Sequence, residues 1–299
     1  MAKVLEPGPE VRAALEEAFL AVSRGTVSVP PRISAETAWG QLLAMPGHVV
    51  GGALCAKLVT VFPGSAPSHQ GLLCLFDAEQ GGVLAVMGAE HLTRIRTAAG
   101  SAMAADVCCP ETARVLCIVG AGSQAEAHLA AFRDLRQWTE IRVWNRTAER
   151  ARSLALADSR AKAVPELREA LRGAEAIVLC THGSEPLFGS ADIAPGAHVS
   201  SVGIGRELPP QLLQEARVLV EWRGAAESGP PSGALDLESV DPATTLELGA
   251  LLHGAELGRE GPGQVTVYKS VGHSAEDCAV AGLAFRLARE RSLGQWVEL

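Results

Sequence analysis

Aromatic residues are scarce in this sequence of 299 residues: they make up 4% of it, and tyrosine occurs once. Hydrophobic residues nevertheless reach 47%, so a core has to be built mainly from Ala, Val, Leu and Ile. No apolar run approaches the ~20 residues that a membrane span requires, and the first ten residues lack the apolar segment of a signal peptide. These absences predict a soluble protein with no membrane partner.

The sequence also has fewer basic than acidic residues. Lys and Arg number 26 against 34 Asp and Glu, and the net charge of −8 argues against a nucleic-acid partner, because binding to phosphates requires a positive field. The seven cysteines form no C-x-x-C pair and stand mostly in apolar runs. We interpret them as reduced core residues of a cytoplasmic protein, and we expect neither disulfides nor a metal site.

Two different patterns divide the chain, which at this length is expected to form two cores. Near the N-terminus, helical spacing over residues 11–22 is followed by short apolar runs at 53–62, 71–76 and 83–87, separated by Gly and Pro. Gly81-Gly82 between the last two runs is a hairpin signal, so this region is expected to form an antiparallel sheet. A helix dense in alanine is expected over 92–107.

The middle of the chain alternates strands and helices instead. Strands are predicted at 114–119, 141–144, 163–164, 176–180, 198–202, 217–221 and 265–268, with helices between them. Such alternation predicts right-handed βαβ units and a doubly wound parallel sheet. A last helix at about 275–291 is expected to pack back on the N-terminal sheet. The predicted fold class is therefore α/β, with a parallel-sheet domain at 111–269 inserted in a discontinuous α+β domain of residues 1–110 and 270–299.

A glycine-rich turn follows the first strand of that alternating region. Its residues are Gly120, Ala121, Gly122, Ser123, Gln124 and Ala125. Gly120 permits the tight turn, Gly122 lets a pyrophosphate approach the backbone, and Ala125 stands where a small residue lets helix and strand pack. The N–H groups at the helix start favour an anion. The segment is typical of a Rossmann dinucleotide site, with residues 120–124 as cofactor contacts.

The end of the second strand indicates which dinucleotide binds. NAD-binding proteins usually carry Asp or Glu there, for the ribose hydroxyls. This chain has Asn145, Arg146 and Thr147, with Arg150 one turn later. Two guanidinium groups in place of a carboxylate can hold a 2′-phosphate, although the same arginines could simply form a solvated helix start. NADPH is therefore favoured as cofactor, with NADH possible but less favoured.

Further short motifs are spread along most of the chain. They are Lys57-Leu58-Val59-Thr60, Pro67-Ser68-His69-Gln70, Leu92-Thr93, Arg96-Thr97-Ala98-Ala99, Trp144-Asn145-Arg146-Thr147, Glu247-Leu248-Gly249, Thr266 to Gly272, and Glu276-Asp277. With the glycine turn, they resemble the ornithine cyclodeaminase/mu-crystallin family, and within it most closely the mu-crystallin-like ketimine reductases. The resemblance implies a homodimer, with a Rossmann domain inserted in a dimerisation and substrate domain formed by both chain ends.

The same resemblance implies a set of site residues. Arg32, Lys57 and Arg96 match the basic side chains that bind the carboxylate of an amino or imino acid. Each also has an ordinary interpretation, as a surface residue, a snorkelling lysine or a helix cap, although Lys57 interrupts the apolar run 53–61. Further cofactor contacts are implied at Ser68, His69, Thr97, Thr181, His182, Val202 and Ser270.

The sequence departs from the family in the stretch 202–208. Cyclodeaminases carry an Asp there, whereas this chain has no Asp in a shortened loop, and Glu207 looks displaced from that position. Gly205 stands where mu-crystallin-like proteins have a Ser, and Gly88 replaces an Asp. These departures make cyclodeamination a weaker interpretation than reduction.

The favoured function is an NADPH-dependent reductase that transfers hydride to the C=N bond of a cyclic imino acid or ketimine next to a carboxylate. Arg32 and Arg96 would fix the carboxylate, and Lys57, or a water that it holds, would protonate the imine nitrogen. The alternatives are an alanine-type amino-acid dehydrogenase, an ornithine cyclodeaminase that releases ammonia, and a non-enzymatic crystallin or ligand-binding role. The expected partner of the enzyme is a small imino- or amino-acid substrate.

Overall fold

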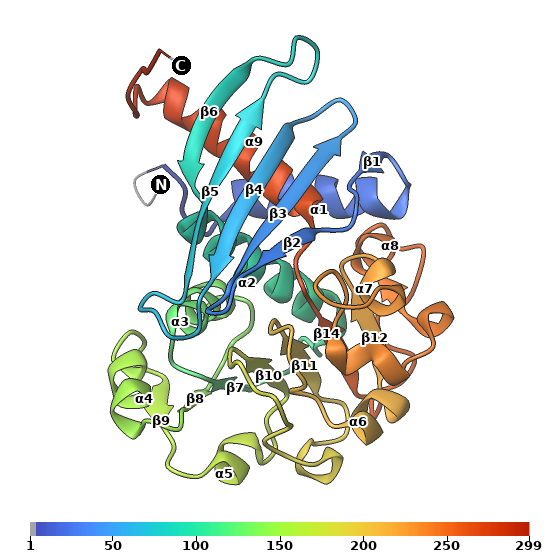
Figure 1. Ribbon diagram of the computed structural model, residues 1–299. Helices are drawn as coiled ribbons and strands as arrows, with labels where there is room; N and C mark the ends of the chain where they lie inside the picture. The colour runs from blue at the N-terminus through green and yellow to red at the C-terminus, as the bar shows by residue number, and fades with distance from the viewer. Residues whose placement is uncertain (1–3, 299) are drawn as a thin grey trace. The chain divides into compact units, whose positions relative to one another are not determined.

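The computed structural model describes residues 4–298, and they divide into two compact units. The described residues up to Arg96 form the first unit together with those from His273 onward, and residues 97–272 form the second. In Figure 1 the first unit is therefore blue and red, whereas the second runs from green to orange. The first unit is discontinuous in the sequence, and the division falls inside one helix, α2 (Ala89–Cys108).

The first unit is an antiparallel sheet with two helices. Its elements are α1 (Pro9–Ser23), β1 (Val27–Ser28), β2 (Ile33–Glu36), β3 (Gln41–Val49), β4 (Leu54–Val61), β5 (His69–Phe76), β6 (Val83–Gly88), the start of α2, and α9 (Ser274–Glu290). The strand order is β1-β3-β4-β5-β6, with β2 also paired to β3. The hairpin expected at Gly81-Gly82 is confirmed, since β5 and β6 pair antiparallel across it.

One face of this sheet is buried under α9, as expected from the sequence. Leu43 and Met45 on β3, and Leu73 and Leu75 on β5, point to that face and are buried, and α9 packs on β3, β4 and β5 (Figure 1). Strand β3 lies before the first predicted strand. Its Pro46-Gly47 pair reads as a turn, but the alternation of buried residues around the pair keeps the segment in the sheet.

The second unit is a parallel sheet of eight strands. Its strands are β7 (Val115–Val119), β8 (Glu140–Trp144), β9 (Ala161–Ala163), β10 (Ala176–Leu179), β11 (His198–Ser201), β12 (Arg217–Val220), β13 (Leu246–Glu247) and β14 (Thr266–Lys269). Their order in space is β13-β12-β14-β11-β10-β7-β8-β9. Its helices are α3 (Ser123–Phe132), α4 (Ala148–Ala155), α5 (Leu167–Leu171), α6 (Pro210–Glu215), α7 (Gly224–Glu227), α8 (Leu248–Leu252) and the short 3-10 turns η1 (Ser190–Asp192), η2 (Leu235–Ser239) and η3 (Pro242–Thr244).

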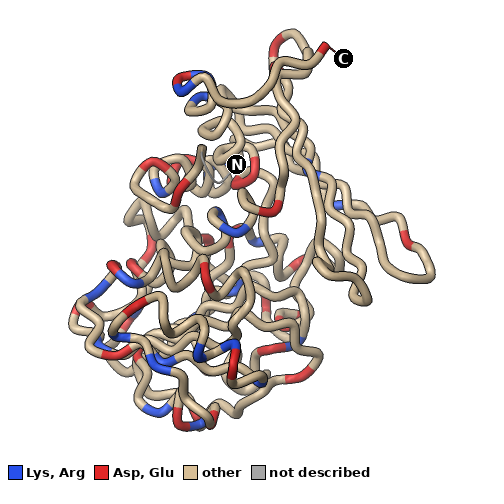
Figure 2. The backbone as a smooth tube through the Cα atoms, turned by 90° about the vertical axis from the view of Figure 1, so that its left-hand side faces the viewer, with Lys and Arg blue, Asp and Glu red and all other residues tan. Residues whose placement is uncertain are grey.

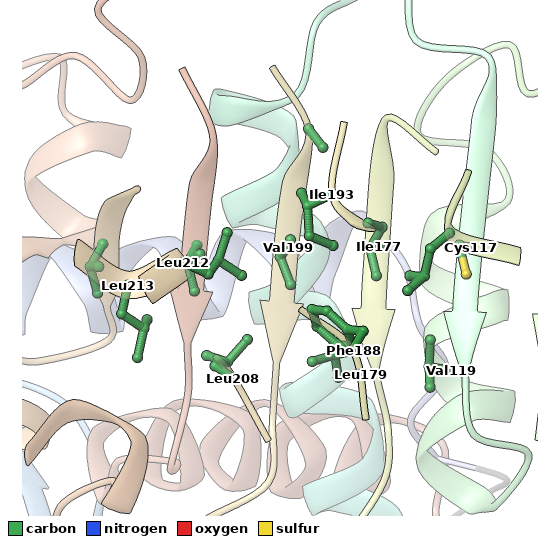
Figure 3. Close-up of a cluster of buried hydrophobic side chains, with 14 of the residues drawn as sticks. Cys117, Val119, Ile177, Leu179, Phe188, Ile193, Val199, Leu208, Leu212 and Leu213 are labelled. Atoms are coloured by element: carbon green, nitrogen blue, oxygen red, sulfur yellow. The ribbon is translucent and has the colours of Figure 1, made fainter. Parts of the chain in front are cut away.

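Both faces of the parallel sheet are buried, which is why its strands read as continuous apolar runs. Cys117, Val119, Ile177 and Leu179 point to one face and pack with a layer that includes Phe188 and Leu212 (Figure 3). The alternate strand residues, such as Leu116, Ile118 and Val178, point to the other face and pack with Leu129 and Phe132 of α3. The expected doubly wound α/β fold is confirmed.

Candidate active site

The glycine turn joins β7 to α3 with the geometry that a dinucleotide requires. Gly120 has a φ of +115°, and a Cβ atom there would lie 2.6 Å from the carbonyl oxygen of Cys180, so only glycine fits. Gly122 is the N-cap of α3, and a Cβ atom on it would meet no described atom within 4 Å. Ala125 is fully buried against the sheet. The turn therefore fits a pyrophosphate, which would occupy the open space beside Gly122 at the N-terminus of α3.

The predicted cofactor residues of the second unit gather at one edge of the sheet. They follow the carboxyl ends of five neighbouring strands: Gly120 to Gln124 after β7, Asn145 to Arg150 after β8, Thr181 and His182 after β10, Val202 after β11, and Ser270 after β14. Open α/β sheets bind ligands at this edge. Thr97 is buried in α2. Ser68 and His69 belong to the first unit, where Ser68 directly precedes β5 and His69 is its first residue; the Ser68 hydroxyl lies 3.0 Å from Nδ1 of His69.

Arg146 and Arg150 differ from the other arginines around β8 and α4. Arg142 is bonded to Glu140, Arg152 to Glu149 and Arg160 to Asp158. Within residues 4–298, no ion pair involves Arg146 or Arg150, and both are exposed. Arg150 also lines a cleft of about 400 Å³ together with Ala121 of the glycine turn and Glu126 of α3. The two guanidinium groups are thus available to an anion near the turn.

A buried acid that sequence reasoning set aside occupies the same edge. Glu207 is 3% exposed. Its Oε1 accepts a hydrogen bond of 2.5 Å from the hydroxyl of Thr181 and one of 3.1 Å from the N–H of Gly183. Its own N–H donates to Asp236, whose carboxylate also lies 2.5 Å from Nζ of the buried Lys269. The loop that follows β11 therefore does carry a carboxylate at the strand ends; this carboxylate is bonded to the segment after β10, and the loop backbone is linked through Asp236 to Lys269 of β14.

Gly205 in this loop is required by packing. A Cβ atom there would lie 2.1 Å from the carbonyl oxygen of Gly183, and one on Gly203 would lie 2.3 Å from Oε2 of Glu207. The serine that mu-crystallin-like proteins are expected to have at position 205 would not fit this loop conformation. The shortened loop is folded tightly onto the segment that follows β10.

In the first unit, Lys57 and Arg96 meet at the start of α9. Lys57 on β4 is 2% exposed and its Nζ lies 2.6 Å from Oδ2 of Asp277. Arg96 on α2 is 4% exposed; its Nε donates to Oδ1 of Asp277 over 3.2 Å, and its Nη1 lies 3.5 Å from Oε2 of Glu276. The interpretations of Lys57 as a snorkelling lysine and of Arg96 as a simple helix cap are therefore wrong, because both cations are buried and paired.

Burial and mutual attraction determine the charges in this cluster. Burial lowers the pKa of the Lys57 ammonium, an effect that the charge of Asp277 opposes and that of Arg96 reinforces. Burial would raise the pKa of Asp277, but Lys57 and Arg96 outweigh it and hold that pKa below its usual value. For Glu276, burial wins and raises the pKa. Asp277 is therefore the carboxylate that stays charged between the two cations.

Arg32 completes the group of basic residues. It stands just before β2 and is half-buried, and its charge lowers the pKa values of Lys57 and Asp277. His273, the N-cap of α9, faces the same cations; burial lowers its pKa to about 4, so it is neutral near pH 7. The structure thus brings all three predicted carboxylate-binding residues together, with Lys57 and Arg96 buried and Arg32 half-buried beside them.

Sequence reasoning identified the cations of this cluster but gave no role to their acids. Glu276 and Asp277 begin a long helix whose following residues are mostly apolar and buried. Acids in a first helical turn are favoured by the helix dipole, which makes the pair look ordinary. Only full burial shows that Asp277 needs a cation, since an isolated buried carboxylate would cost several kcal/mol.

The described range, residues 4–298, offers neither a metal-binding cluster nor a membrane-spanning helix. No group of three or more His, Cys, Asp or Glu side chains in this range is arranged to hold a metal ion. Each helix in the same range is too short or too polar to cross a membrane.

Comparisons with known proteins agree with the fold. The sequence model of the Ornithine cyclodeaminase/mu-crystallin family matches residues 7–292. The ketimine reductase mu-crystallin of Mus musculus is 36% identical over 256 residues, which cover 82% of this chain and 80% of that protein.

Solved structures extend the similarity to nearly the whole chain. The Δ1-pyrroline-2-carboxylate reductase of Thermococcus litoralis, in complex with NADH and L-proline, has a TM-score of 0.91 at 27% identity, over 99% of this chain and 98% of that one. An archaeal alanine dehydrogenase dimer with bound NAD also has a TM-score of 0.91, at 26% identity, over 99% of this chain and 96% of that one.

Proposed function

The chain belongs to the ornithine cyclodeaminase/mu-crystallin family, and on that premise we propose that it is an NADPH-dependent reductase of imines. Its substrates are cyclic imino acids or ketimines in which the C=N carbon also carries a carboxylate. Two similar proteins are a ketimine reductase and a Δ1-pyrroline-2-carboxylate reductase, and the latter was solved with NADH and L-proline. The product of the proposed reaction is the corresponding amino acid.

The observation that carries this proposal is the buried cluster around Lys57 and Arg96. With Arg32, three cations face two carboxylates, and burial raises the pKa of one of these, Glu276. The cluster thus gathers three basic side chains, beside which a substrate carboxylate would find partners of opposite charge. Arg32 and Arg96 are the side chains proposed to bind that carboxylate, through charge-assisted hydrogen bonds.

Lys57 is proposed to supply the proton of the reaction. A bound nicotinamide supplies hydride to the carbon of the C=N bond. An ammonium has three N–H donors, more than Oδ2 of Asp277 can accept, so Nζ of Lys57 can hold Asp277 and the imine nitrogen at once. A protonated or hydrogen-bonded imine accepts hydride more readily. In total, one imine, one NADPH and one proton give one amine and one NADP+.

NADPH is the proposed cofactor, held at the carboxyl edge of the parallel sheet. The open space at Gly122 is proposed for the pyrophosphate, and Arg146 and Arg150 for the 2′-phosphate. Asn145, whose amide donates to the carbonyl of Thr147, takes the position where an NAD-specific site has an acid. Ser68, His69, Thr97, Thr181, His182, Val202 and Ser270 complete the proposed set of contacts.

We also propose a homodimer, formed by the outer face of the antiparallel sheet. Lys57, which points inward, is the one Lys, Arg, Asp or Glu between positions 41 and 76, and Figure 2 shows long uncharged stretches along these strands. Leu42, Leu72 and Val86 on the opposite face are 40%, 40% and 57% exposed. An exposed apolar face of this kind favours association with a second copy.

Analytical sedimentation tests the proposed dimer, and Leu72→Glu should give a monomer. The control is Leu156→Glu, at a leucine of the second unit that is 88% exposed, and it should leave the dimer intact.

The compartment that fits the chain is the cytoplasm. All seven cysteines are free, as expected of a protein in a reducing environment.

We propose that the two units have different roles. The first, with both chain ends, holds the substrate and the dimer contact, and the second holds the dinucleotide.

An amino-acid dehydrogenase is the second candidate function, because an archaeal alanine dehydrogenase is structurally similar along nearly the whole chain. Ornithine cyclodeamination keeps some support from Glu207, a buried acid in the loop that follows β11.

One set of assays distinguishes the three functions. An imine reductase oxidises NADPH with Δ1-pyrroline- or Δ1-piperideine-2-carboxylate, a dehydrogenase does so with pyruvate and free ammonia, and a cyclodeaminase releases ammonia from ornithine with no net change in cofactor.

A further inference from the structure

Asp277 is bound to both proposed substrate-binding cations at once. Oδ2 of its carboxylate lies 2.6 Å from Nζ of Lys57 and Oδ1 accepts from Nε of Arg96 over 3.2 Å. The two cations come from different elements, β4 and α2, and the carboxylate from a third, α9. Asp277 is fully buried. A single carboxylate therefore fixes the separation between an ammonium and a guanidinium.

We propose that Asp277 is a positioning residue for the reduction: it holds Lys57 and Arg96 in the spacing that the imine nitrogen and the carboxylate of one substrate require, and it keeps Lys57 protonated. The inference rests on the proposed function for its kinetic consequences. Its statement about Lys57 stands on the geometry of the cluster alone.

The separation between Lys57 and Arg96 is controlled by electrostatics. Lys57 and Arg96 are like charges close together in a buried environment, where repulsion is poorly screened. Asp277 pairs with both cations. Its attraction to each of them offsets their mutual repulsion. Without this carboxylate, the long side chains of Lys57 and Arg96 would separate, and a substrate would have to bring them together again at a cost in affinity and orientation.

The charge of Lys57 depends on the charged and titratable groups around it. These groups are Asp277 and Glu276 on α9, His273 at its N-cap, Arg96 on α2, Arg32 before β2, and Cys55 two residues away on β4. Burial, Arg96 and Arg32 favour the neutral amine, whereas the carboxylate of Asp277 favours the ammonium. Asp277 is thus the neighbour on which the proton of Lys57 chiefly depends.

A purely structural role explains the cluster less well. Helix α9 already buries Ala275, Cys278, Val280, Ala281 and Leu283, and such a face is enough to dock a helix on a sheet. Replacing a buried ion pair by apolar residues is often neutral or stabilising. Stability therefore does not require two cations and a carboxylate here, but a site for an anionic imine does.

The chain is well suited to a direct test by NMR, because it has four lysines, Lys3, Lys57, Lys162 and Lys269. Labelling the full-length protein with 13C at lysine Cε allows each amine to be titrated, and the loss of one signal in Lys57→Arg assigns Lys57. We expect Asp277→Asn to lower the titration midpoint of Lys57 by about 1 to 3 pH units, the usual effect of one close charge. Lys269, buried against Asp236, is the internal control, and its signal should be the same in Asp277→Asn and in the wild type.

Enzyme kinetics on the same variants test the second half of the proposal. In Asp277→Asn, the alkaline limb of kcat/KM should move to lower pH together with the NMR midpoint, and KM for the imine should rise about tenfold or more. Asp277→Glu should restore part of both effects and serves also if the asparagine variant does not fold. Asp236→Asn, which removes another buried carboxylate from a buried lysine, should leave the alkaline limb in place.

Three results would overturn the inference: an unchanged Lys57 midpoint in Asp277→Asn, an unchanged alkaline limb despite a shifted midpoint, or an equal shift in Asp236→Asn. A wild-type protein that reduces no imine would instead refute the proposed function. The NMR titration would still decide whether Asp277 controls the charge of Lys57.

Discussion

The hydroxyl of Thr181 donates a hydrogen bond of 2.5 Å to Oε1 of Glu207. This contact joins the residue that follows β10 to the loop that follows β11, at the edge where the dinucleotide is proposed to bind. The same carboxylate oxygen accepts from the N–H of Gly183, so one acid holds the Thr181 side chain and the Gly183 backbone on either side of His182. The conformation of this proposed cofactor contact thus depends on Glu207.

Glu207→Ala should weaken both folding and cofactor binding. It removes the acceptor of two donors that are partly buried, which costs about 1 to 3 kcal/mol of unfolding free energy, and it frees the Thr181–Gly183 segment. Urea denaturation measures the first effect and fluorescence titration with NADPH the second. Glu185→Ala removes an exposed acid from the same loop and is the control. A wild-type Kd for NADPH in Glu207→Ala would contradict the assigned role.

Gly120 and Gly122 should respond differently to a single added methyl group. Gly120→Ala places a Cβ atom 2.6 Å from a backbone oxygen at a φ of +115°, so it should destabilise the fold by about 1 to 3 kcal/mol or more. Gly122→Ala meets no described atom and should cost at most about 1 kcal/mol, the usual loss when Ala replaces Gly at an N-cap.

Cofactor binding distinguishes the same two variants. Gly122→Ala should fold normally and yet raise the Kd for NADPH about tenfold or more, because its methyl group occupies the space proposed for the pyrophosphate. Differential scanning calorimetry and calorimetric titration measure the two quantities. Tight NADPH binding by Gly122→Ala would mean that the pyrophosphate lies elsewhere.

Arg146→Ala and Arg150→Ala test the choice of cofactor. A hydrogen bond to a charged group is worth about 1.5 to 3 kcal/mol, so each variant should raise KM for NADPH about 10- to 100-fold while KM for NADH changes little. Arg152→Ala, in the same helix but paired with Glu149, should affect neither. Equal losses with both cofactors would refute the assignment of these arginines to the 2′-phosphate.

Buried histidines should make the protein sensitive to acid. Burial lowers the pKa of His128 to about 4 and that of His198 to about 3, against 6.5 for a free histidine. The folded protein keeps both neutral, whereas the unfolded chain protonates them below about pH 6.5, so the unfolded state binds more protons and stability falls as the pH drops from 6.5 towards 4.

A titration of stability against pH checks this effect. For His128 alone, the loss across this range is about 3 kcal/mol. In His128→Gln, which can still bond to Ser101, the unfolding free energy should decline less steeply between pH 6.5 and 4 than in the wild type. His253→Gln, at an exposed histidine, is the control. Equal slopes in all three proteins would contradict the prediction.

Features set by local sequence could be predicted, and the structure has them. The glycine turn is recognisable because Gly120 needs a backbone conformation that other residues rarely adopt. The parallel sheet is recognisable because strands buried on both faces read as unbroken apolar runs. Strand β3 was missed because Pro46-Gly47 is locally a turn signal, and long-range pairing with β4 overrides it.

Features set by pairing across the chain could not be predicted. Nothing near Asp277 in the sequence shows that it meets Lys57 and Arg96, since these residues are brought together only when α9 packs on the sheet. Glu207 looked displaced because its position depends on how the loop with Gly203 and Gly205 folds onto Gly183. In both cases, a carboxylate becomes functionally informative only once its burial and its partners are known.

The central claim is that hydride passes from the nicotinamide to the imine carbon beside the carboxylate, with Lys57 supplying the proton. Reduction of Δ1-pyrroline-2-carboxylate with NADPH deuterated at C4 of the nicotinamide tests it most directly, with the product examined by mass spectrometry and NMR. The account predicts proline that carries deuterium at Cα, and a rate that falls at least about a hundredfold in Lys57→Met. Product without deuterium at Cα, or an undiminished rate in Lys57→Met, would contradict it.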